Sequence, residues 1–205
     1  MAAGLAELPL AGVQSVESWK ATEQGELLAN VPIVPVKKAM SSPPSLLSNN
    51  VRCPLEGLKV LCVTHAIAGP SAGRTLAEYG ASVLQIMYTH GFEYPFVYTY
   101  ANLGCSSSRL DINKESDRVH MWKLVRDADV WIDSYRDGAM RKFGFTDDKL
   151  HEANSSLTIS HFRVYGTEGP WAPKPKFDMQ GSASSGLMAL CCSCTRRSYP
   201  GCVLC

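Results

Sequence analysis

A strand, a tight turn, a helix and a second strand follow one another between residues 58 and 87, and this order restricts the chain to few folds. Residues 58–63 form a short apolar run behind Gly57, which is typical of a strand buried on both faces. Pro70 has the fixed φ favoured at a helix start, and residues 82–87 read as the second strand. Such a β-α-β unit predicts a parallel sheet, and open parallel sheets bind ligands beyond the carboxyl ends of their strands.

The chain beyond this unit extends the pattern to an open, mainly parallel, Rossmann-like α/β sheet of about four strands with helices on both faces. Helical periodicity covers residues 114–128, and apolar runs predict strands at 129–133 and 157–162. Thr146, followed by two acids, is typical of a helix N-cap. Residues 88–108 are rich in Tyr, Gly and Ser without a clean period, so we expect a long loop there.

Composition excludes several classes of partner. The 205 residues carry a formal net charge of +1, which gives no argument for binding to nucleic acid or to a membrane surface. No apolar run reaches the length of a membrane-spanning helix, and the N-terminus lacks the basic start and apolar core of a signal peptide. We therefore expect an intracellular protein, cytoplasmic or in another internal compartment, that uses neither nucleic acid nor membrane as a partner.

Three motifs at fixed spacing resemble the opening of class III CoA-transferases, the CaiB/BaiF family. They are Leu55-Glu-Gly-Leu-Lys-Val-Leu, Ala68-Gly-Pro and Leu76-Ala-Glu-Tyr-Gly-Ala-Ser-Val. The resemblance continues in order to about Ala189. It implies the N-terminal, incomplete part of a CoA-transferase large domain, with coenzyme A or an acyl-CoA bound beside Ala68, Gly69 and Pro70.

The loop after the predicted strand 129–133 extends the resemblance. Ser134-Tyr-Arg-Asp-Gly matches a loop whose usual sequence in family members is Asn-Phe-Arg-Pro-Gly. By this match, Ser134 and Tyr135 contact the coenzyme and Lys142 its phosphates. From the residues alone, Arg136, Arg141 and Lys142 read instead as a solvated helix face.

Two more segments resemble coenzyme-binding parts of the family. Tyr165-Gly-Thr-Glu-Gly-Pro is similar to the family's Phe-Gly-x-x-Gly-Pro turn, which adds Tyr165 to the site. The family usually places Lys or Arg where this chain has Cys105 and Ser106. In this part of the chain, cationic contacts to the phosphates therefore come from Arg109 or Lys114, or they are missing.

Asp178 stands at the start of a predicted helix that continues with small residues. By itself an acid in this position reads as an N-cap. By resemblance it falls on the family's catalytic aspartate, which attacks an acyl-CoA thioester to form a mixed anhydride and then an aspartyl-CoA thioester. The implied reaction is CoA transfer between an acyl-CoA and a carboxylic acid, with no metal. The racemase branch uses the same aspartate for proton transfer and usually has His before it, where this chain has Phe177, so we favour transfer.

Two further features remain open to alternative interpretations. The tyrosines and phenylalanines within residues 88–108 either stack on an adenine or cover a sheet edge or interface, and the second is favoured. His161 is expected to be a packed strand residue rather than a catalytic one.

The chain divides into three expected segments. Residues 1–50 are a poorly ordered leader with at most one short helix, or the remnant of a preceding module. Residues 51–190 are the CoA-transferase part, and residues 191–205 are an atypical Cys-rich tail. Family members are about twice as long and form interlocked homodimers, so we expect a homodimer only for a full-length chain. The alternative function is that of a non-catalytic fragment that binds nucleotide or a homologous subunit.

The tail holds five of the eight cysteines, and three interpretations of it are open. The cysteines are spaced poorly for a zinc site. Cys202-Val-Leu-Cys fits the C-a-a-X form of a prenylation signal but ends in an atypical residue. We favour the third reading, an unselected sequence from a shifted frame or an incomplete gene model.

Overall fold

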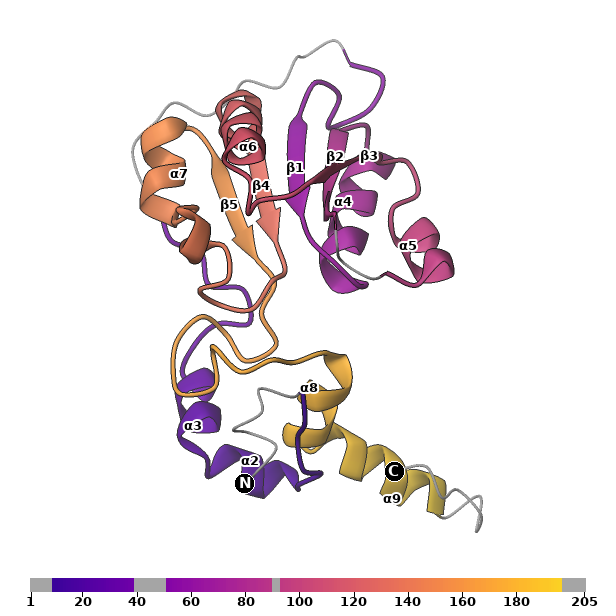
Figure 1. The fold of residues 1–205 in the computed structure, drawn as a ribbon. Coiled ribbons are helices and arrows are strands. Elements are labelled where there is room, and N and C mark those ends of the chain that lie inside the picture. The colour runs from indigo at the N-terminus through magenta and orange to yellow at the C-terminus, as the bar shows by residue number, and fades with distance from the viewer. Residues whose placement is uncertain (1–8, 39–50, 90–92, 197–205) are drawn as a thin grey trace. The chain divides into compact units, whose positions relative to one another are not determined.

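Two compact units make up the part of the chain that the computed structural model describes, which comprises residues 9–38, 51–89 and 93–196, without the side chains of 192–196 (Figure 1). Unit 1 combines the described residues up to Lys37 with those from Arg163 onward. Unit 2 is the continuous stretch between them and ends at Phe162. This grouping differs from the expected division at residues 50 and 190.

Unit 2 is built on one parallel sheet with the strand order β3-β2-β1-β4-β5. The strands are β1 (Lys59–Val63), β2 (Ser82–Tyr88), β3 (Ser106–Leu110), β4 (Val130–Asp133) and β5 (Thr158–His161). The parallel α/β class is confirmed, but the expected number of about four strands is wrong because β3 is an additional edge strand. Its serines are exposed, so it lacks the apolar pattern by which the other strands are recognised.

Helices cover both faces of the sheet (Figure 1). They are α4 (Ala68–Glu78), α5 (Pro95–Ala101), α6 (Glu115–Asp127), the 3-10 turn η1 (Arg141–Phe143) and α7 (Asp147–Ala153). Thr146 is the N-cap of α7, as expected, and its side chain accepts a hydrogen bond from Lys149 N. The long loop expected over residues 88–108 is wrong, because α5 and the start of β3 lie within it.

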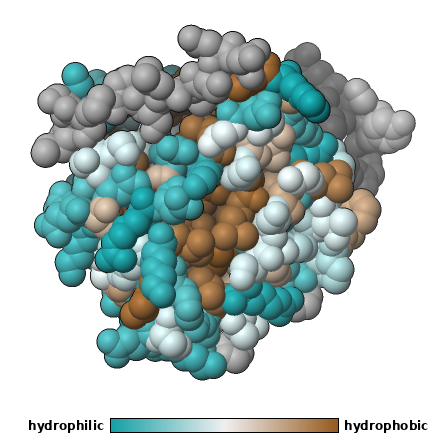
Figure 2. Space-filling model, turned by 90° about the horizontal axis from the view of Figure 1, so that it is seen from above, coloured by the Kyte–Doolittle hydropathy of each residue, from teal (hydrophilic) through white to brown (hydrophobic). Residues whose placement is uncertain are grey.

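The core of unit 2 follows the alternation of side chains along the strands. On one face, Leu61 and Val63 pack with Met121 of α6 in the larger buried cluster. On the other face, Val60 and Cys62 pack with residues of α4. Seen from the end at which the strands begin, apolar side chains lie at the centre of the molecule's surface and hydrophilic ones surround them (Figure 2).

Unit 1 joins two segments that are far apart in the sequence. Its helices are α2 (Val16–Lys20), α3 (Glu23–Ala29), α8 (Asp178–Ser184) and α9 (Leu187–Arg196). Two helices thus replace the single short one expected near residues 13–28. Each begins with a hydroxyl N-cap, Ser15 for α2 and Thr22 for α3, and Gly25 inside α3 obscures the second helix in the sequence.

Gln24 connects α3 to the glycine-rich turn of unit 1. It is fully buried, and its Nε2 donates to the carbonyl oxygens of Tyr165 at 2.8 Å and Glu168 at 2.9 Å. Its Oε1 accepts from Trp171 N at 2.9 Å. The rings of Trp19, Tyr165 and Trp171 pack beside it, with centroids 5.2–6.2 Å apart. One amide side chain therefore supplies three hydrogen bonds to backbone groups of residues 165–171.

The described residues bear on two expectations, one about membrane-spanning helices and one about metal sites. None of the helices described here has the length and apolarity needed to cross a bilayer. The described residues also hold no group of three or more His, Cys, Asp or Glu arranged for a metal ion.

Of the tail cysteines, Cys191 is exposed. The side chains of the other four lie outside the described part, so the zinc and prenylation interpretations, which depend on them, stay predictions.

Candidate functional site

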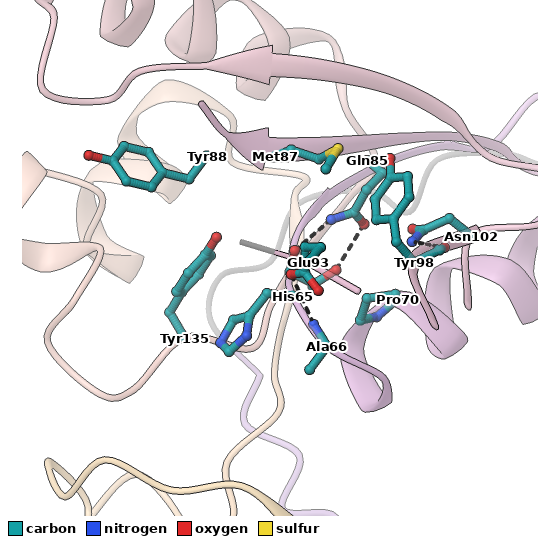
Figure 3. Close-up of a pocket in the computed structure, with 11 residues that line it drawn as sticks. His65, Ala66, Pro70, Gln85, Met87, Tyr88, Glu93, Tyr98, Asn102 and Tyr135 are labelled. Carbon is teal, nitrogen blue, oxygen red and sulfur yellow. Dashed lines mark hydrogen bonds between the residues drawn. The ribbon is translucent and has the colours of Figure 1, made fainter. Parts of the chain in front are cut away.

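A cavity of about 150 Å³ lies at the carboxyl ends of β1 and β2 (Figure 3). The order of the strands reverses on either side of β1, and open α/β sheets bind ligands in the crevice at this position. The cavity is lined by Thr64, His65, Ala66, Pro70, Gln85, Met87, Tyr88, Glu93, Tyr98, Asn102 and Tyr135. Its residues come from the ends of three adjacent strands, from the first turn of α4 and from α5 with its C-cap.

A pair of buried polar side chains forms one wall of this cavity. Thr64 Oγ1 donates to Gln85 Oε1 at 2.8 Å, and Gln85 Nε2 donates to the Thr64 carbonyl oxygen at 2.6 Å. Thr64 is 3% exposed and Gln85 2% exposed. The reciprocal pair satisfies two buried polar groups and fixes the end of β1 against β2.

Two buried polar atoms of the lining have no such partner among the described residues. They are Tyr98 Oη and Asn102 Oδ1. The Asn102 amide nitrogen is used, because it donates to the Tyr98 carbonyl oxygen at 2.9 Å. Buried polar atoms are paired in the great majority of cases. These two atoms are therefore available to hydrogen-bond a molecule that enters the cavity.

The rings of His65 and Tyr135 pack against each other in the lining, with centroids 4.7 Å apart (Figure 3). Burial lowers the pKa of His65, and the opposing effect of the Glu93 charge is smaller. Burial, followed by the charges of Glu93 and Asp133, raises the pKa of Tyr135 to about 12. At neutral pH the imidazole is uncharged and the phenol keeps its proton.

Glu93 gives the cavity its only charged side chain among the described lining residues. Its Oε1 accepts a hydrogen bond from Ala66 N at 3.2 Å. An acid without a Lys or Arg in the same described lining disfavours phosphate groups inside the cavity. The cavity is therefore suited to an uncharged part of a ligand that donates hydrogen bonds.

Four of the predicted coenzyme-binding residues meet at this edge of the sheet. Pro70 and Tyr135 line the cavity, and Gly69 packs against Ser134 so closely that a Cβ on the glycine would lie 2.8 Å from Ser134 Cβ. The Ser134 hydroxyl also accepts from His65 N at 3.1 Å, which ties the end of β4 to the end of β1. Ala68 belongs to the same turn and is exposed.

The other predicted residues lie elsewhere in the two units. Arg109 on β3 and Lys142 in η1 are exposed and do not line the cavity. Tyr165 is buried in unit 1, where its hydroxyl donates to the Gln180 carbonyl oxygen at 3.1 Å. Asp178, the predicted nucleophile, is also in unit 1, so it and the cavity belong to different units.

Asp178 is the first residue of α8 and is exposed, but it is not the N-cap. The capping role that the residues alone indicate does not hold, because Phe177 occupies the N-cap position. The Phe177 backbone N–H donates instead to Gln180 Oε1 at 2.9 Å. Gln180 thus accepts the N–H of the N-cap residue, which is the reciprocal half of a capping box.

A second group of polar side chains lies at the ends of β4 and β5. His161 Nδ1 is 2.5 Å from Asp133 Oδ2, and its Nε2 is 3.1 Å from Asp147 Oδ1. Burial by itself lowers the pKa of His161, but the hydrogen bonds to both carboxylates and their charges together raise it to about 9. His161 is thus a cation held between two acids rather than only a packed strand residue.

A larger, apolar cavity of about 260 Å³ adjoins the first one along the same edge of the sheet. Met87, Tyr88 and Tyr135 line both cavities. Apart from Asn113, the remaining lining is apolar, and it comes from β1, β2, β3, α6, the segment between β3 and α6, and residues 139–143. The three shared side chains therefore lie between a polar space and an apolar one.

Sequence reasoning missed several lining residues. Thr64 and His65 directly follow the predicted first strand, so their position at a carboxyl end could have identified them. Glu93, Tyr98 and Asn102 lie in the segment that was expected to be a loop, and the sequence carries no periodic signal that places them beside Gln85.

A parallel sheet with a cavity at its switch point and a close-packed Gly-Pro turn is the arrangement in which open α/β proteins bind ligands. The model of CoA-transferase family III matches residues 55–203. The chain belongs to CoA-transferase family III. The matched range extends past Ala189, where the resemblance was expected to end.

Characterised relatives agree with this assignment. An acetyl-coenzyme A transferase of Hypoxylon pulicicidum is 36% identical over 138 residues, which cover 65% of this chain and 23% of that protein. An acetyl-CoA:oxalate CoA-transferase of Acetobacter aceti is 32% identical over 149 residues, covering 66% of this chain and 38% of that protein. This chain thus spans well under half the length of these relatives.

Solved structures also support the assignment to this family. A Mycobacterium tuberculosis protein superposes with a TM-score of 0.61 at 30% identity, covering 67% of this chain and 41% of that one. A CAIB/BAIF family protein from Brucella suis has a TM-score of 0.60 at 28% identity, covering 66% and 40%. Both similarities include the α/β fold described above.

Proposed function

We propose that this chain takes part in CoA transfer from an acyl-CoA to a carboxylic acid, with Asp178 as the nucleophile and the cavity of unit 2 as part of the coenzyme site. The proposal rests mainly on two buried polar atoms, Tyr98 Oη and Asn102 Oδ1, which have no hydrogen-bond partner among the described residues. Both belong to residues that line the cavity at the switch point of the sheet. Relatives named as acetyl-CoA:oxalate and succinyl-CoA:mesaconate CoA-transferases support the reaction class.

The chemistry of the cavity suggests which part of the coenzyme it takes. Adenine is uncharged, and its exocyclic amine donates hydrogen bonds that Asn102 Oδ1 or the Glu93 carboxylate can accept. Its ring nitrogens accept, which suits the Tyr98 hydroxyl. The phosphates would lie outside the cavity, where Lys142 and Arg109 are exposed cations.

Asp178 would carry out the covalent steps. A carboxylate oxygen of Asp178 attacks the thioester carbonyl, the C–S bond breaks, and a mixed anhydride and the CoA thiolate result. The thiolate then attacks the aspartyl carbonyl, which releases the first acid and leaves an aspartyl-CoA thioester. The acceptor carboxylate repeats both steps in reverse order, so it leaves as the new acyl-CoA and Asp178 is regenerated.

Each step passes through an oxyanion that requires backbone N–H donors. The turn from Gly166 to Gly169 is the nearest candidate along the chain, and both glycines have positive φ. Gln24 fixes this turn, because its Nε2 donates to the carbonyl oxygens of Tyr165 and Glu168 and its Oε1 leaves no room for a side chain at Gly169. The turn therefore has a defined backbone before any ligand binds.

Trapping of the covalent intermediate tests the proposal. After incubation with acetyl-CoA, intact mass spectrometry should show an acyl or CoA adduct on the wild-type chain that hydroxylamine removes. Asp178→Asn should show none. Asp148→Asn is the matched control, since Asp148 is an exposed acid in the first turn of α7, and it should keep the adduct. If the wild-type chain binds acetyl-CoA without forming an adduct, the chain is a non-catalytic, coenzyme-binding fragment instead.

A further inference from the structure

We propose that His161, bound between Asp133 and Asp147, is a positioning residue that holds the loop Ser134–Tyr135 in the geometry needed for an anionic coenzyme. This inference rests on the proposed function, because it concerns the same cavity. His161 itself does not line the cavity and would act through Asp133.

The backbone places His161 beside the strand end that carries the loop. β4 pairs with both β1 and β5, and Asp133 is in register with Val63 on one side and with His161 on the other. Asp133 is the last residue of β4, so Ser134 and Tyr135 follow it directly. No turn separates Asp133 from Ser134 and Tyr135. A shift of Asp133 therefore changes the backbone position of these two residues directly.

The loop is in turn fixed to the first strand by hydrogen bonds. Ser134 Oγ accepts from His65 N at 3.1 Å and lies 3.4 Å from the His65 carbonyl oxygen, to which it donates. The His65 ring packs on the ring of Tyr135. A continuous set of contacts thus connects His161 to the cavity through Asp133, Ser134 and His65.

The charges around His161 decide how the arrangement responds to pH. Asp133 faces the ring from β4, and its side chain is 3% exposed. Asp147 faces the ring from the first turn of α7, and its side chain is 61% exposed. The Tyr135 phenol also interacts with Asp133, and it keeps its proton below about pH 12.

A protonated ring donates from both nitrogens and offsets one of the two carboxylate charges. A neutral ring has a single N–H and can donate to only one of the two acids. Its loss of charge also leaves both carboxylates uncompensated at the edge of the sheet where a polyanionic ligand would bind. Both effects weaken binding in the same direction as the pH rises.

The groups around the His161 ring determine the pH range in which the ring loses its proton. The two carboxylates raise the pKa of His161 to about 9 against the effect of burial. The ring therefore stays protonated at neutral pH, and affinity for the coenzyme should decrease as the pH passes about 9. Removal of the Asp147 charge should move this decrease to lower pH, since one of the two groups that raise the pKa is lost.

Calorimetric titration with acetyl-CoA between pH 7 and 10 tests the inference, and the thioester avoids titration of a free thiol. The wild-type Kd should rise by about fivefold or more across this range. Asp147→Asn should show the same rise at lower pH, and His161→Gln should bind more weakly at pH 7 and lack the step. A wild-type Kd without a step, or a step kept in His161→Gln, would overturn the role of His161 while the coenzyme site stands.

A second readout needs no ligand and separates this inference from the proposed function. In NMR titrations, the backbone amides of Ser134 and Tyr135 should shift with the same midpoint as the His161 ring, and that midpoint should move down in Asp147→Asn. If the wild-type chain fails to bind acetyl-CoA at any pH, the proposed function fails, and these shifts still decide the inference. Amides that do not follow the ring would overturn it.

Discussion

Gly69 and Ser134 approach so closely that a Cβ added to the glycine would lie 2.8 Å from the Cβ of the serine. The same added atom would lie 2.7 Å from Thr64 Cγ2. Only a residue without a side chain allows α4 to begin directly against the ends of β1 and β4. This contact brings Pro70, Ser134 and Tyr135 together at one edge of the sheet.

Gly69→Ala should therefore destabilise unit 2 and weaken binding of the coenzyme. Both neighbouring side chains are short and directly follow the last residues of β1 and β4, so relief of the clash requires a backbone shift. Such overpacking costs about 1–3 kcal/mol. Urea denaturation checks the prediction, with Gly12→Ala as the control because nothing lies within 4 Å of a Cβ at Gly12. Equal stability of the two variants would contradict it.

Tyr98→Phe should separate stability from binding. Removal of a buried hydroxyl without a described partner should leave the free energy of unfolding unchanged or raise it by up to about 1 kcal/mol. The variant should nevertheless bind acetyl-CoA about tenfold more weakly, because the ligand loses a hydrogen bond.

Calorimetry and thermal denaturation of the same samples check this prediction. Tyr100→Phe is the matched control, since Tyr100 is on the same helix and 60% exposed. If Tyr98→Phe lost stability and kept its affinity, the hydroxyl would serve the fold and not the ligand.

Gln24→Ala should destabilise unit 1 selectively. The substitution leaves the Tyr165 and Glu168 carbonyl groups and the Trp171 N–H without their partner. The expected loss is about 2–4 kcal/mol, since each buried group left unpaired is costly. Hydrogen exchange of the amides in residues 165–171 measures it. Glu26→Ala, an exposed acid on the same helix, should leave the protection of these amides within about 0.5 kcal/mol of wild type.

The stability of unit 2 should depend on pH through His161. The folded pKa of about 9 lies above the ordinary value of 6.5. The protonated ring therefore contributes its full stabilisation below pH 6.5, and this contribution is lost progressively until about pH 9. Partial exposure of the ring reduces the expected change to about 2 kcal/mol.

Urea denaturation at pH 6 and pH 9.5 measures this change. His161→Gln should remove most of the difference between the two pH values. His120→Gln, which alters an exposed residue of α6, should retain it. An unchanged pH dependence in His161→Gln would show that other groups titrate in this window.

The parts of the fold that the sequence predicted are those with a local signal. β1, α4 and β2 combine a short apolar run, a helix-starting proline and a second apolar run, and each of these features acts within a few residues. β3 lacked such a signal, since Ser106, Ser107 and Ser108 form an exposed edge strand. α5 has a helix-starting proline, Pro95, but the aromatic residues that follow it show no clean helical period. Pairing with β2 stabilises β3, and this contact is not visible in the strand's own residues.

The candidate site was predicted only in part for a related reason. Gly69, Pro70, Ser134 and Tyr135 follow predicted strands or start the helix behind them, so the rule about carboxyl ends locates them. The contacts between Asp133 and His161 and between Thr64 and Gln85 join residues 28 and 21 positions apart. They depend on strand order and register, which a single sequence does not provide.

Gln24 also has a consequence for the order in which the chain acquires its structure during synthesis. The backbone groups that it binds lie 141–147 residues later, so α3 leaves the ribosome long before its partners exist. Unit 2 is continuous in the sequence and is complete before Trp171 has been added. The segment that carries Trp19 and Gln24 must therefore stay without these partners, with its apolar ring exposed, until unit 2 and residues 165–171 have been synthesised, and exposed apolar segments of this kind are the ones that chaperones bind.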